Sequence, residues 1–225
     1  MRPFRPPTAP RATQTIVALC FAIQLLLSLL GAGAAQFAYA HFALIPQMVV
    51  AAWQGQGYAG AYVGLVSGIF LHAGWTHLIL NMLFFFWVGR AVEWILGAGR
   101  LTLLFLFGGI IGGLAQIGAD PTSLVPVVGA SGAISAIFAA YALLFAQRRV
   151  ESRTWAGVRW SGALLNALWV AAFWIGLQLM IGILLSGPDG EGIAIWAHIA
   201  GFLTGLILTQ IYARLRLKNG GGYSL

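Results

Sequence analysis

Charged side chains and cysteine are both scarce in this sequence. Only 8% of its 225 residues are Asp, Glu, Lys or Arg, whereas about 25% is usual for a soluble domain. A chain of this length could not cover a water-facing surface with so few charges, so the composition excludes an ordinary soluble domain. The single cysteine, Cys20, can form no internal disulfide, and we interpret it as a small packing or lipid-facing residue.

Long apolar runs take the place of the missing charges. Hydrophobic residues make up 60% of the chain, and they recur in runs of about 20 residues, the length of a helix that crosses a bilayer. We therefore predict an all-α polytopic membrane protein with a bundle of six transmembrane helices. The expected spans are Thr15–Ala40, Trp75–Val92, Leu101–Gly118, Ala130–Gln147, Ser161–Leu185 and Ile193–Leu215.

The predicted bundle makes residues 14–215 a single membrane domain. Residues 1–13, with four prolines and three arginines, are expected to form a flexible cytoplasmic leader, and residues 216–225 a cytoplasmic tail. The arginines before the first span resemble the start of a signal peptide. However, the apolar run that follows them is too long and no cleavage site is convincing, so we interpret it as a retained helix.

Basic residues are restricted to one side of the predicted membrane. All 12 Lys and Arg lie before the first helix, between helices 2 and 3, between helices 4 and 5, or after the sixth. The segments on the other side, 41–74, 119–129 and 186–192, contain none. The positive-inside rule makes both termini cytoplasmic, and we expect the bacterial inner (plasma) membrane. The net charge of +7 then indicates contact with anionic lipid headgroups and not with nucleic acid.

The longest connection, residues 41–74, is too apolar for a solvated loop. Its Trp53, Tyr58 and Tyr62 are residue types that gather at the headgroup level of a membrane. We predict a structured loop with short helices that lies partly in the outer leaflet.

Four polar residues are expected at one depth near the outer side. Ser131 begins the fourth helix, and His198 lies about 8 Å below the outer end of the sixth, at ~1.5 Å per residue. His77 and Asn81 share a face in the first turns of the second helix. Polar side chains inside a membrane need partners and indicate a functional site. A serine becomes a nucleophile when a histidine takes its proton, and His77, Asn81 and the Ser131 backbone N–H are candidate donors to the resulting oxyanion.

Small residues allow the close helix crossing that a serine–histidine pair requires. Gly129 and Gly132 lie beside Ser131, and Gly201 and Gly205 share one face of the sixth helix. Taken singly, each of these polar and small residues is explained by packing. Their common depth and their glycine neighbours together favour a catalytic site.

Three stretches resemble the signatures of rhomboid intramembrane serine proteases, in order and on the matching helices. They are HAGWTHLILN (His72, His77, Asn81), GASG (residues 129–132) and AHIAGFLTG (residues 197–205), with GRAVEWILGAGRL (Glu93, Gly97) as the helix 2–3 turn. The resemblance covers about residues 60–210 and implies a six-helix bundle that cleaves transmembrane-helix substrates near their outer end. It implies Ser131 as nucleophile, His198 as base, and an oxyanion site of His77, Asn81 and the Ser131 amide. It also implies that His72 supports the first loop or the hydration of the site.

Two positions depart from the family's pattern. Many rhomboids carry a tyrosine one turn after the nucleophile, stacked on the catalytic histidine, whereas this chain has Ser135, which we expect to hydrogen-bond His198 instead. Many also carry a Trp-Arg pair in the first loop, but this chain has no Lys or Arg between Arg11 and Arg90. Neither position belongs to the dyad or to the oxyanion site, which favours an active enzyme.

Two other functions stay open from the sequence. A rhomboid-like non-catalytic protein that binds transmembrane helices would share the fold and would tolerate Ser131→Ala. A small transporter could use His72, His77 and His198 as a proton or metal path, although these histidines cluster at one leaflet with no polar chain leading inward. The favoured function needs no cofactor and no metal.

Overall fold

The described chain is almost entirely helical. The computed structural model describes residues 9–145, 152–155, 157–162, 165–166, 168–170, 172–176 and 194–218. In chain order its elements are α1 (Arg11–Leu30), α2 (Ala32–Phe42), α3 (Pro46–Trp53), the 3-10 helix η1 (Ala59–Val63), α4 (Gly64–Ser67), α5 (Trp75–Leu96), α6 (Ala98–Ala119), α7 (Ser131–Phe145), the strands β1 (Arg153–Trp155) and β2 (Val158–Trp160), and α9 (Ile195–Lys218). The described residues between 162 and 176 are also helical.

Four of the described helices are long and apolar enough to cross a bilayer. They are α1, α5, α6 and residues 195–212 of α9. The fourth predicted span begins as expected in α7, whose described part is a shorter apolar helix of 15 residues. The fifth predicted span, 161–185, lies in part outside the described residues.

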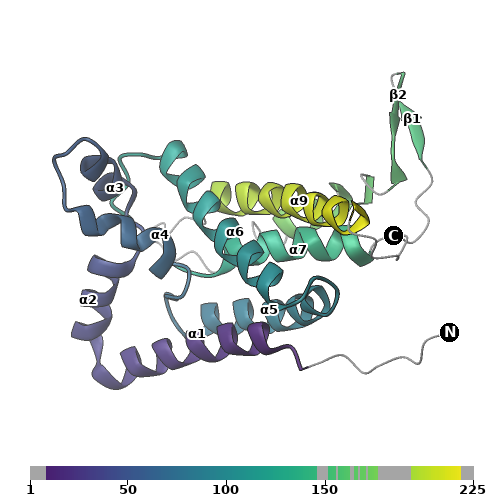
Figure 1. Ribbon diagram of the computed structural model, residues 1–225. Coiled ribbons are helices and arrows are strands. Elements are labelled where there is room, and N and C mark those ends of the chain that lie inside the picture. Colours follow the sequence, from purple (N-terminus) through teal and green to yellow (C-terminus); the bar gives the residue numbers. More distant parts are fainter. Residues whose placement is uncertain are drawn as a thin grey trace.

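The first predicted span is wrong in its length. We expected one helix over residues 15–40, but the chain breaks at Gly31 into α1 and α2. Gly31 has a φ of 85°, which glycine adopts without steric cost, and its N–H donates to the Leu27 carbonyl at 3.1 Å. The two helices therefore point in different directions (Figure 1). Hydropathy does not register this turn, because both sides of it are apolar.

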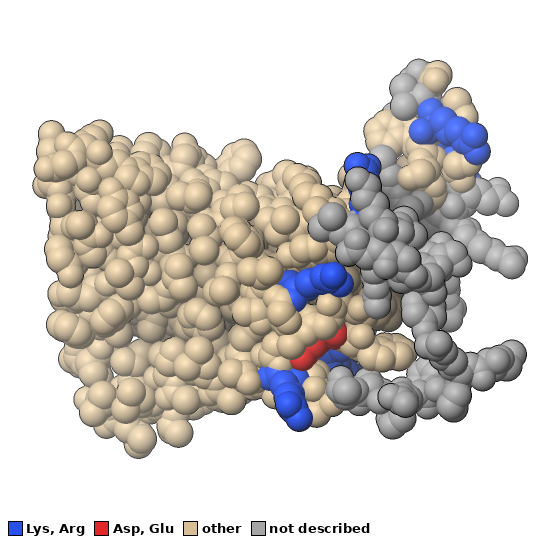
Figure 2. All heavy atoms as spheres, in the orientation of Figure 1, with Lys and Arg blue, Asp and Glu red and all other residues tan. Residues whose placement is uncertain are grey.

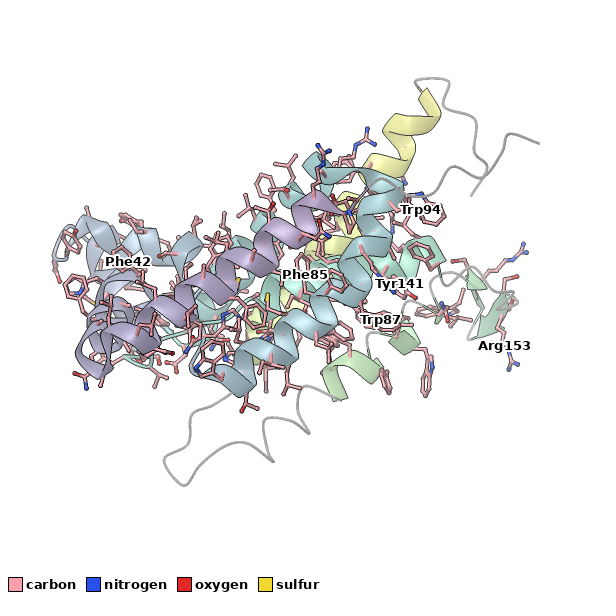
Figure 3. The ribbon with its side chains drawn as sticks, turned by 90° about the horizontal axis from the view of Figure 1, so that it is seen from below. Phe42, Phe85, Trp87, Trp94, Tyr141 and Arg153 are labelled. Carbon is pink, nitrogen blue, oxygen red and sulfur yellow. The ribbon has the colours of Figure 1, made fainter. Side chains whose placement is uncertain are left out.

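Helix α7 occupies the centre of the helical body. It packs against α5, α6 and α9, and α1 packs on the far side of α5 (Figure 1). Every residue of α7 from Gly132 to Ala140 is buried. The largest fully buried side chains lie mainly on the neighbouring helices and on α7, and they include Phe85, Phe105, Leu78, Met82, Ile134 and Ile137. Figure 3 shows Phe85 in this interior.

The connection between α1 and α5 folds into short helices, as predicted for residues 41–74. These are the end of α2 together with α3, η1 and α4. Leu44 pairs with Val127 through two backbone hydrogen bonds of 3.2 and 2.7 Å, and the Gly129 N–H donates to the Gly68 carbonyl at 3.0 Å. The loop thereby holds the segment that leads directly into Ser131.

The Lys and Arg residues that Figure 2 shows gather at one end of the molecule, whereas Asp120 follows the other end of α6. Helix α1 begins and α9 ends at the end with the Lys and Arg residues, where the β1–β2 hairpin also lies (Figure 1). In the view of Figure 3, Arg153 of the hairpin and Phe42 of α2 lie at opposite ends. Many of the large exposed residues elsewhere are apolar, such as Leu25, Leu26 and Leu83. A surface of this kind suits hydrocarbon and would be costly in water.

Glu93 joins α5 to the beginning of α1. Its Oε1 accepts the Ala12 N–H at 3.0 Å, and its Oε2 accepts both the N–H and the hydroxyl of Thr13, at 2.8 and 2.7 Å. The first N–H groups of a helix have no partner within the helix, and a carboxylate there also suits the helix dipole. Both Glu93 and Thr13 are buried, so this contact fixes the two helices at the charged end.

We expect Glu93→Gln to destabilise the protein by about 1–3 kcal/mol, because an amide cannot accept all three bonds and leaves a buried donor unpaired. Thermal unfolding in detergent measures this loss. Asp120→Asn, at an exposed acidic residue, serves as the control and should change stability by less than about 0.5 kcal/mol. Equal stability of the two variants would contradict the capping role of Glu93.

Candidate active site

Ser131 and His198 form a hydrogen-bonded pair at the beginning of two helices. Ser131 is the first residue of α7 and His198 the fourth of α9. The Ser131 Oγ lies 2.6 Å from the His198 Nε2. His198 is 5% exposed and Ser131 is half-buried. The structure thus brings together the two residues that the sequence placed at one depth.

The backbones of α7 and α9 approach closely enough for this bond because glycines line their crossing. A Cβ on Gly201 would collide with the carbonyl of Gly132, and a Cβ on Gly205 with the carbonyl of Ala136. Gly112 of α6 faces the backbone of Ala197 in the same way. The backbone contacts of α9 with α6 and α7 therefore fix the position of His198 near Ser131.

His77 lies against the segment that precedes Ser131. A Cβ on Gly129, whose φ is 114°, would lie 2.8 Å from the His77 Nε2. The Ala73 N–H points to the His77 Nδ1 at 3.4 Å. A backbone N–H can only donate, so this contact assigns the ring proton to Nε2. His77 therefore presents a donor beside Gly129, two residues before Ser131. Gly129 itself lies before α7, and it packs on the side chain of His77 from α5.

Asn81 lies one turn after His77 on the same face of α5. Its Nδ2 donates to the His77 carbonyl at 3.1 Å, which holds the amide along the helix. The side chain is half-buried. An amide nitrogen has two N–H groups, and the second is the candidate donor to a negatively charged oxygen.

His72 lies just before α5 and is fully buried. Its ring contacts that of His77 edge-on, with centroids 5.2 Å apart, and its Nδ1 lies 3.3 Å from the Phe70 carbonyl. Burial, and then the neighbouring His77, lower the pKa of His72 to about 3, so the ring is neutral at neutral pH. The Tyr39 hydroxyl donates to the His72 carbonyl at 2.8 Å, and this bond ties α2 to the end of the first loop, just before α5.

Ser135 makes a different contact from the one expected. Its hydroxyl donates to the carbonyl of Ser131 at 2.9 Å and accepts the indole N–H of Trp174 at 2.8 Å. A serine hydroxyl has one proton, and here that proton points along α7 and not toward His198. Trp174 was not among the residues expected at the site. A buried tryptophan N–H needs an acceptor, but this holds for every buried tryptophan and does not indicate Ser135 as the partner.

The arrangement suits a nucleophile, a base and a set of donors. The described residues contain no group of three or more His, Cys, Asp or Glu that could hold a metal ion. What they do contain is a serine hydrogen-bonded to an imidazole, with the His77 ring packed on Gly129 two residues before that serine. Such a combination is typical of acyl transfer by an activated serine.

Comparison with known proteins identifies the class of protein. The family model described as the Rhomboid domain matches residues 59–215. The chain belongs to the rhomboid family, and with this family and its apolar helices it is an integral membrane protein.

Individual relatives match over shorter stretches. The chain is 43% identical over 75 residues to the rhomboid protease GluP of Bacillus subtilis, which is 33% of this chain and 14% of that protein. It is 31% identical over 151 residues to the human rhomboid-related protein 3, covering 65% of this chain and 35% of that one. It is 26% identical over 199 residues to the rhomboid protease GlpG of Klebsiella pneumoniae, covering 88% and 62%. The chain thus spans less than two thirds of the length of each of these relatives.

We expect Gly201→Ala to destabilise the protein by about 1–3 kcal/mol, as other overpacked cores are. The added methyl group meets the Gly132 carbonyl and must push α9 away from α7. Gly118→Ala is the matched control, because a Cβ there meets no atom within 4 Å. Thermal unfolding of both variants in detergent measures the difference. If the two variants unfold alike, the α7–α9 crossing is looser than its backbone contacts indicate.

Proposed function

We propose that this protein is an intramembrane serine endopeptidase in which Ser131 is the nucleophile and His198 the general base. The observation that carries the proposal is the 2.6 Å contact between the Ser131 Oγ and the His198 Nε2. The membership of the chain in the rhomboid family supports it, as do relatives named rhomboid proteases. No cofactor and no metal ion is needed for this chemistry.

In the proposed reaction His198 takes the proton of Ser131 as the serine oxygen attacks the scissile carbonyl. His198 then returns the proton to the leaving amine, and water releases the acyl group in a second half-reaction of the same kind. The negative charge on the former carbonyl oxygen is stabilised by His77, Asn81 and the Ser131 backbone N–H. His72 positions His77 and the first loop.

The proposed substrates are transmembrane helices of other proteins, cut near the outer leaflet. A peptide bond inside a stable helix hides its carbonyl in an i to i−4 bond. Releasing that backbone in lipid costs several kcal/mol for each unsatisfied group. Glycine or proline near the cut lowers this cost, since they weaken a helix by about 1 and 3 kcal/mol. The small residues around Ser131 favour a small residue before the cut.

We propose a six-helix protease domain over residues 14–215, between a cytoplasmic leader (1–13) and a cytoplasmic tail (216–225), in a bacterial inner membrane. The restriction of all 12 Lys and Arg to one side supports this orientation. Ser131 then opens toward the face opposite to both termini.

We expect Ser131→Ala and Asn81→Ala to fail in different ways. The assay uses a single-pass substrate with a Gly-Ala pair one or two turns below its outer boundary, and an all-leucine helix as the uncut control. Ser131→Ala should abolish both cleavage and labelling by a fluorophosphonate probe, because the attacking oxygen is gone. Asn81→Ala should still be labelled but should cut about 10²–10³-fold more slowly, the usual loss for one oxyanion donor.

Mass spectrometry locates the label, and thermal unfolding shows that each variant is folded. A label on another serine would overturn the assignment of Ser131. Cleavage that survives in a folded Ser131→Ala variant would favour the non-catalytic, helix-binding alternative. Unchanged turnover in Asn81→Ala would leave Asn81 a structural residue.

The proposed orientation predicts the outcome of reporter fusions. A reporter that is active only outside the cytoplasm should be silent when fused after residue 220 and active when fused after residue 188, because one helix separates these points. The reverse pattern would contradict the orientation. A cytoplasm-only reporter at the same two points is the control, since it should give the complementary result.

A further inference from the structure

Trp174 makes a polar contact with the helix that carries Ser131. It is 5% exposed, and its indole ring stacks on Phe84 of α5, with centroids 4.3 Å apart, and packs at 5.1 Å on Phe138 of α7. Its Nε1–H donates to the Ser135 Oγ at 2.8 Å. This is a buried hydrogen bond between residues 39 positions apart in sequence. The ring is therefore held in one orientation by packing and by a hydrogen bond.

A directed chain of two hydrogen bonds runs from Trp174 to the backbone of Ser131. An indole nitrogen can only donate, so the Ser135 oxygen is the acceptor in the first bond. The single proton of that hydroxyl is then free to complete the second bond, to the Ser131 carbonyl at 2.9 Å. Ser135 is fully buried, so no bulk water competes for either bond. Consecutive bonds of this kind also polarise and strengthen one another.

We propose that Trp174 is a positioning residue for Ser131, acting through the hydroxyl of Ser135. This inference rests on the proposed function, because its consequence is the rate of attack by Ser131. Ser131 is the first residue of α7, where a helix has the fewest internal hydrogen bonds. A second donor to its carbonyl, beside the helical one, limits the fraying of this first turn. It also sets the tilt of the turn, since serine side chains that bond the i−4 carbonyl bend helices.

The geometry of the reactive pair explains why so remote a contact matters. The Ser131 oxygen must meet both the His198 nitrogen and the substrate carbonyl, and small displacements of reacting groups cost large factors in rate. His198 is fixed by the backbone contacts of α9 with Gly112 and Gly132. The side chain of Ser131 is held by its hydrogen bond to His198, but the Ser131 backbone lies at a helix end. The two hydrogen bonds that run from Trp174 through Ser135 restrain the Ser131 carbonyl from the interior of the protein.

The experiment removes the indole N–H while keeping the ring. Trp174 is replaced by 3-benzothienylalanine, a tryptophan isostere with sulfur in place of the N–H group, and separately by Phe. These variants are combined with Ser135→Ala to complete a double-mutant cycle. The same isostere at position 169 is the matched control, because Trp169 lies on the same helical segment but is 70% exposed. Three quantities are measured for each folded variant: kcat, KM, and the rate of fluorophosphonate labelling of Ser131.

We expect the isostere at position 174 to lower kcat and the labelling rate by about 3- to 10-fold, the factor that one net hydrogen bond represents. KM should stay within about 2-fold, because the lost interaction orients the nucleophile and does not bind substrate. Ser135→Ala should lower kcat by a similar factor, and the double variant should be no slower than the slower single variant. The control at position 169 should match the wild type.

Two results would overturn the inference while leaving the proposed function intact. One is wild-type kcat and labelling in the isostere at position 174, which would make Trp174 a packing residue only. The other is additive losses in the double variant, which would mean that Trp174 and Ser135 act separately.

Ultraviolet resonance Raman difference spectra give a readout without activity, since they report whether the indole at position 174 donates a hydrogen bond. A wild-type protein that is folded but not labelled would instead overturn the proposed function, and the positioning role with it.

Discussion

The contact between the backbones of α7 and α9 is the constraint on which the rest of the site depends. Gly201 and Gly205 leave room for the carbonyls of Gly132 and Ala136, and no larger side chain fits there. In a membrane, helices are held together by close packing and hydrogen bonds, because lipid is as apolar as the helix surface. The same glycines therefore join the two helices and bring the His198 ring to the Ser131 hydroxyl. A substitution that separates the two helices would therefore reduce both the stability of the protein and the contact between Ser131 and His198.

A few polar contacts help to set the position of the remaining segments. Glu93 joins α5 to the first turn of α1, and the Tyr39 hydroxyl joins α2 to the His72 carbonyl. The Ser67 hydroxyl lies 2.6 Å from the Phe42 carbonyl and 2.8 Å from the Val63 carbonyl, and its contact with Phe42 joins α4 to the end of α2. An unpaired polar group in hydrocarbon is costly, so each contact disfavours arrangements that would break it. Apolar packing between similar helices has no such selectivity, and these bonds therefore help to specify one arrangement.

The first loop acts on the site from outside the helical body. Its pairing of Leu44 with Val127, and of Gly68 with Gly129, holds the residues directly before α7. Trp174 reaches α7 from the opposite direction, one turn after Ser131. The first turn of α7 is thus held by contacts of the residues before Ser131 and by a contact of Ser135 after it. This explains how a serine at a helix end, where backbone hydrogen bonds are fewest, can lie at a defined distance from a base on another helix.

The sequence by itself was sufficient for the class of protein and for the set of candidate residues. Apolar runs predict helices reliably, because each span must satisfy its own backbone in lipid. Counting along those runs predicts a common depth for Ser131, His198, His77 and Asn81. The short helices of residues 41–74 were also expected, since that loop is too apolar to be solvated.

Only the tertiary structure decided the details that depend on direction. The break at Gly31 was missed because a turn between two apolar helices leaves no trace in hydropathy. The partners of Ser135 were misassigned, because spacing along α7 gives the face on which a hydroxyl lies but not which neighbouring helix supplies a donor. Trp174 is distant from Ser135 in sequence, and the bond between them exists because packing on Phe84 and Phe138 orients the ring. The residues that share a face of one helix can be inferred from their spacing in the sequence, whereas the contact between two helices depends on the shape of both.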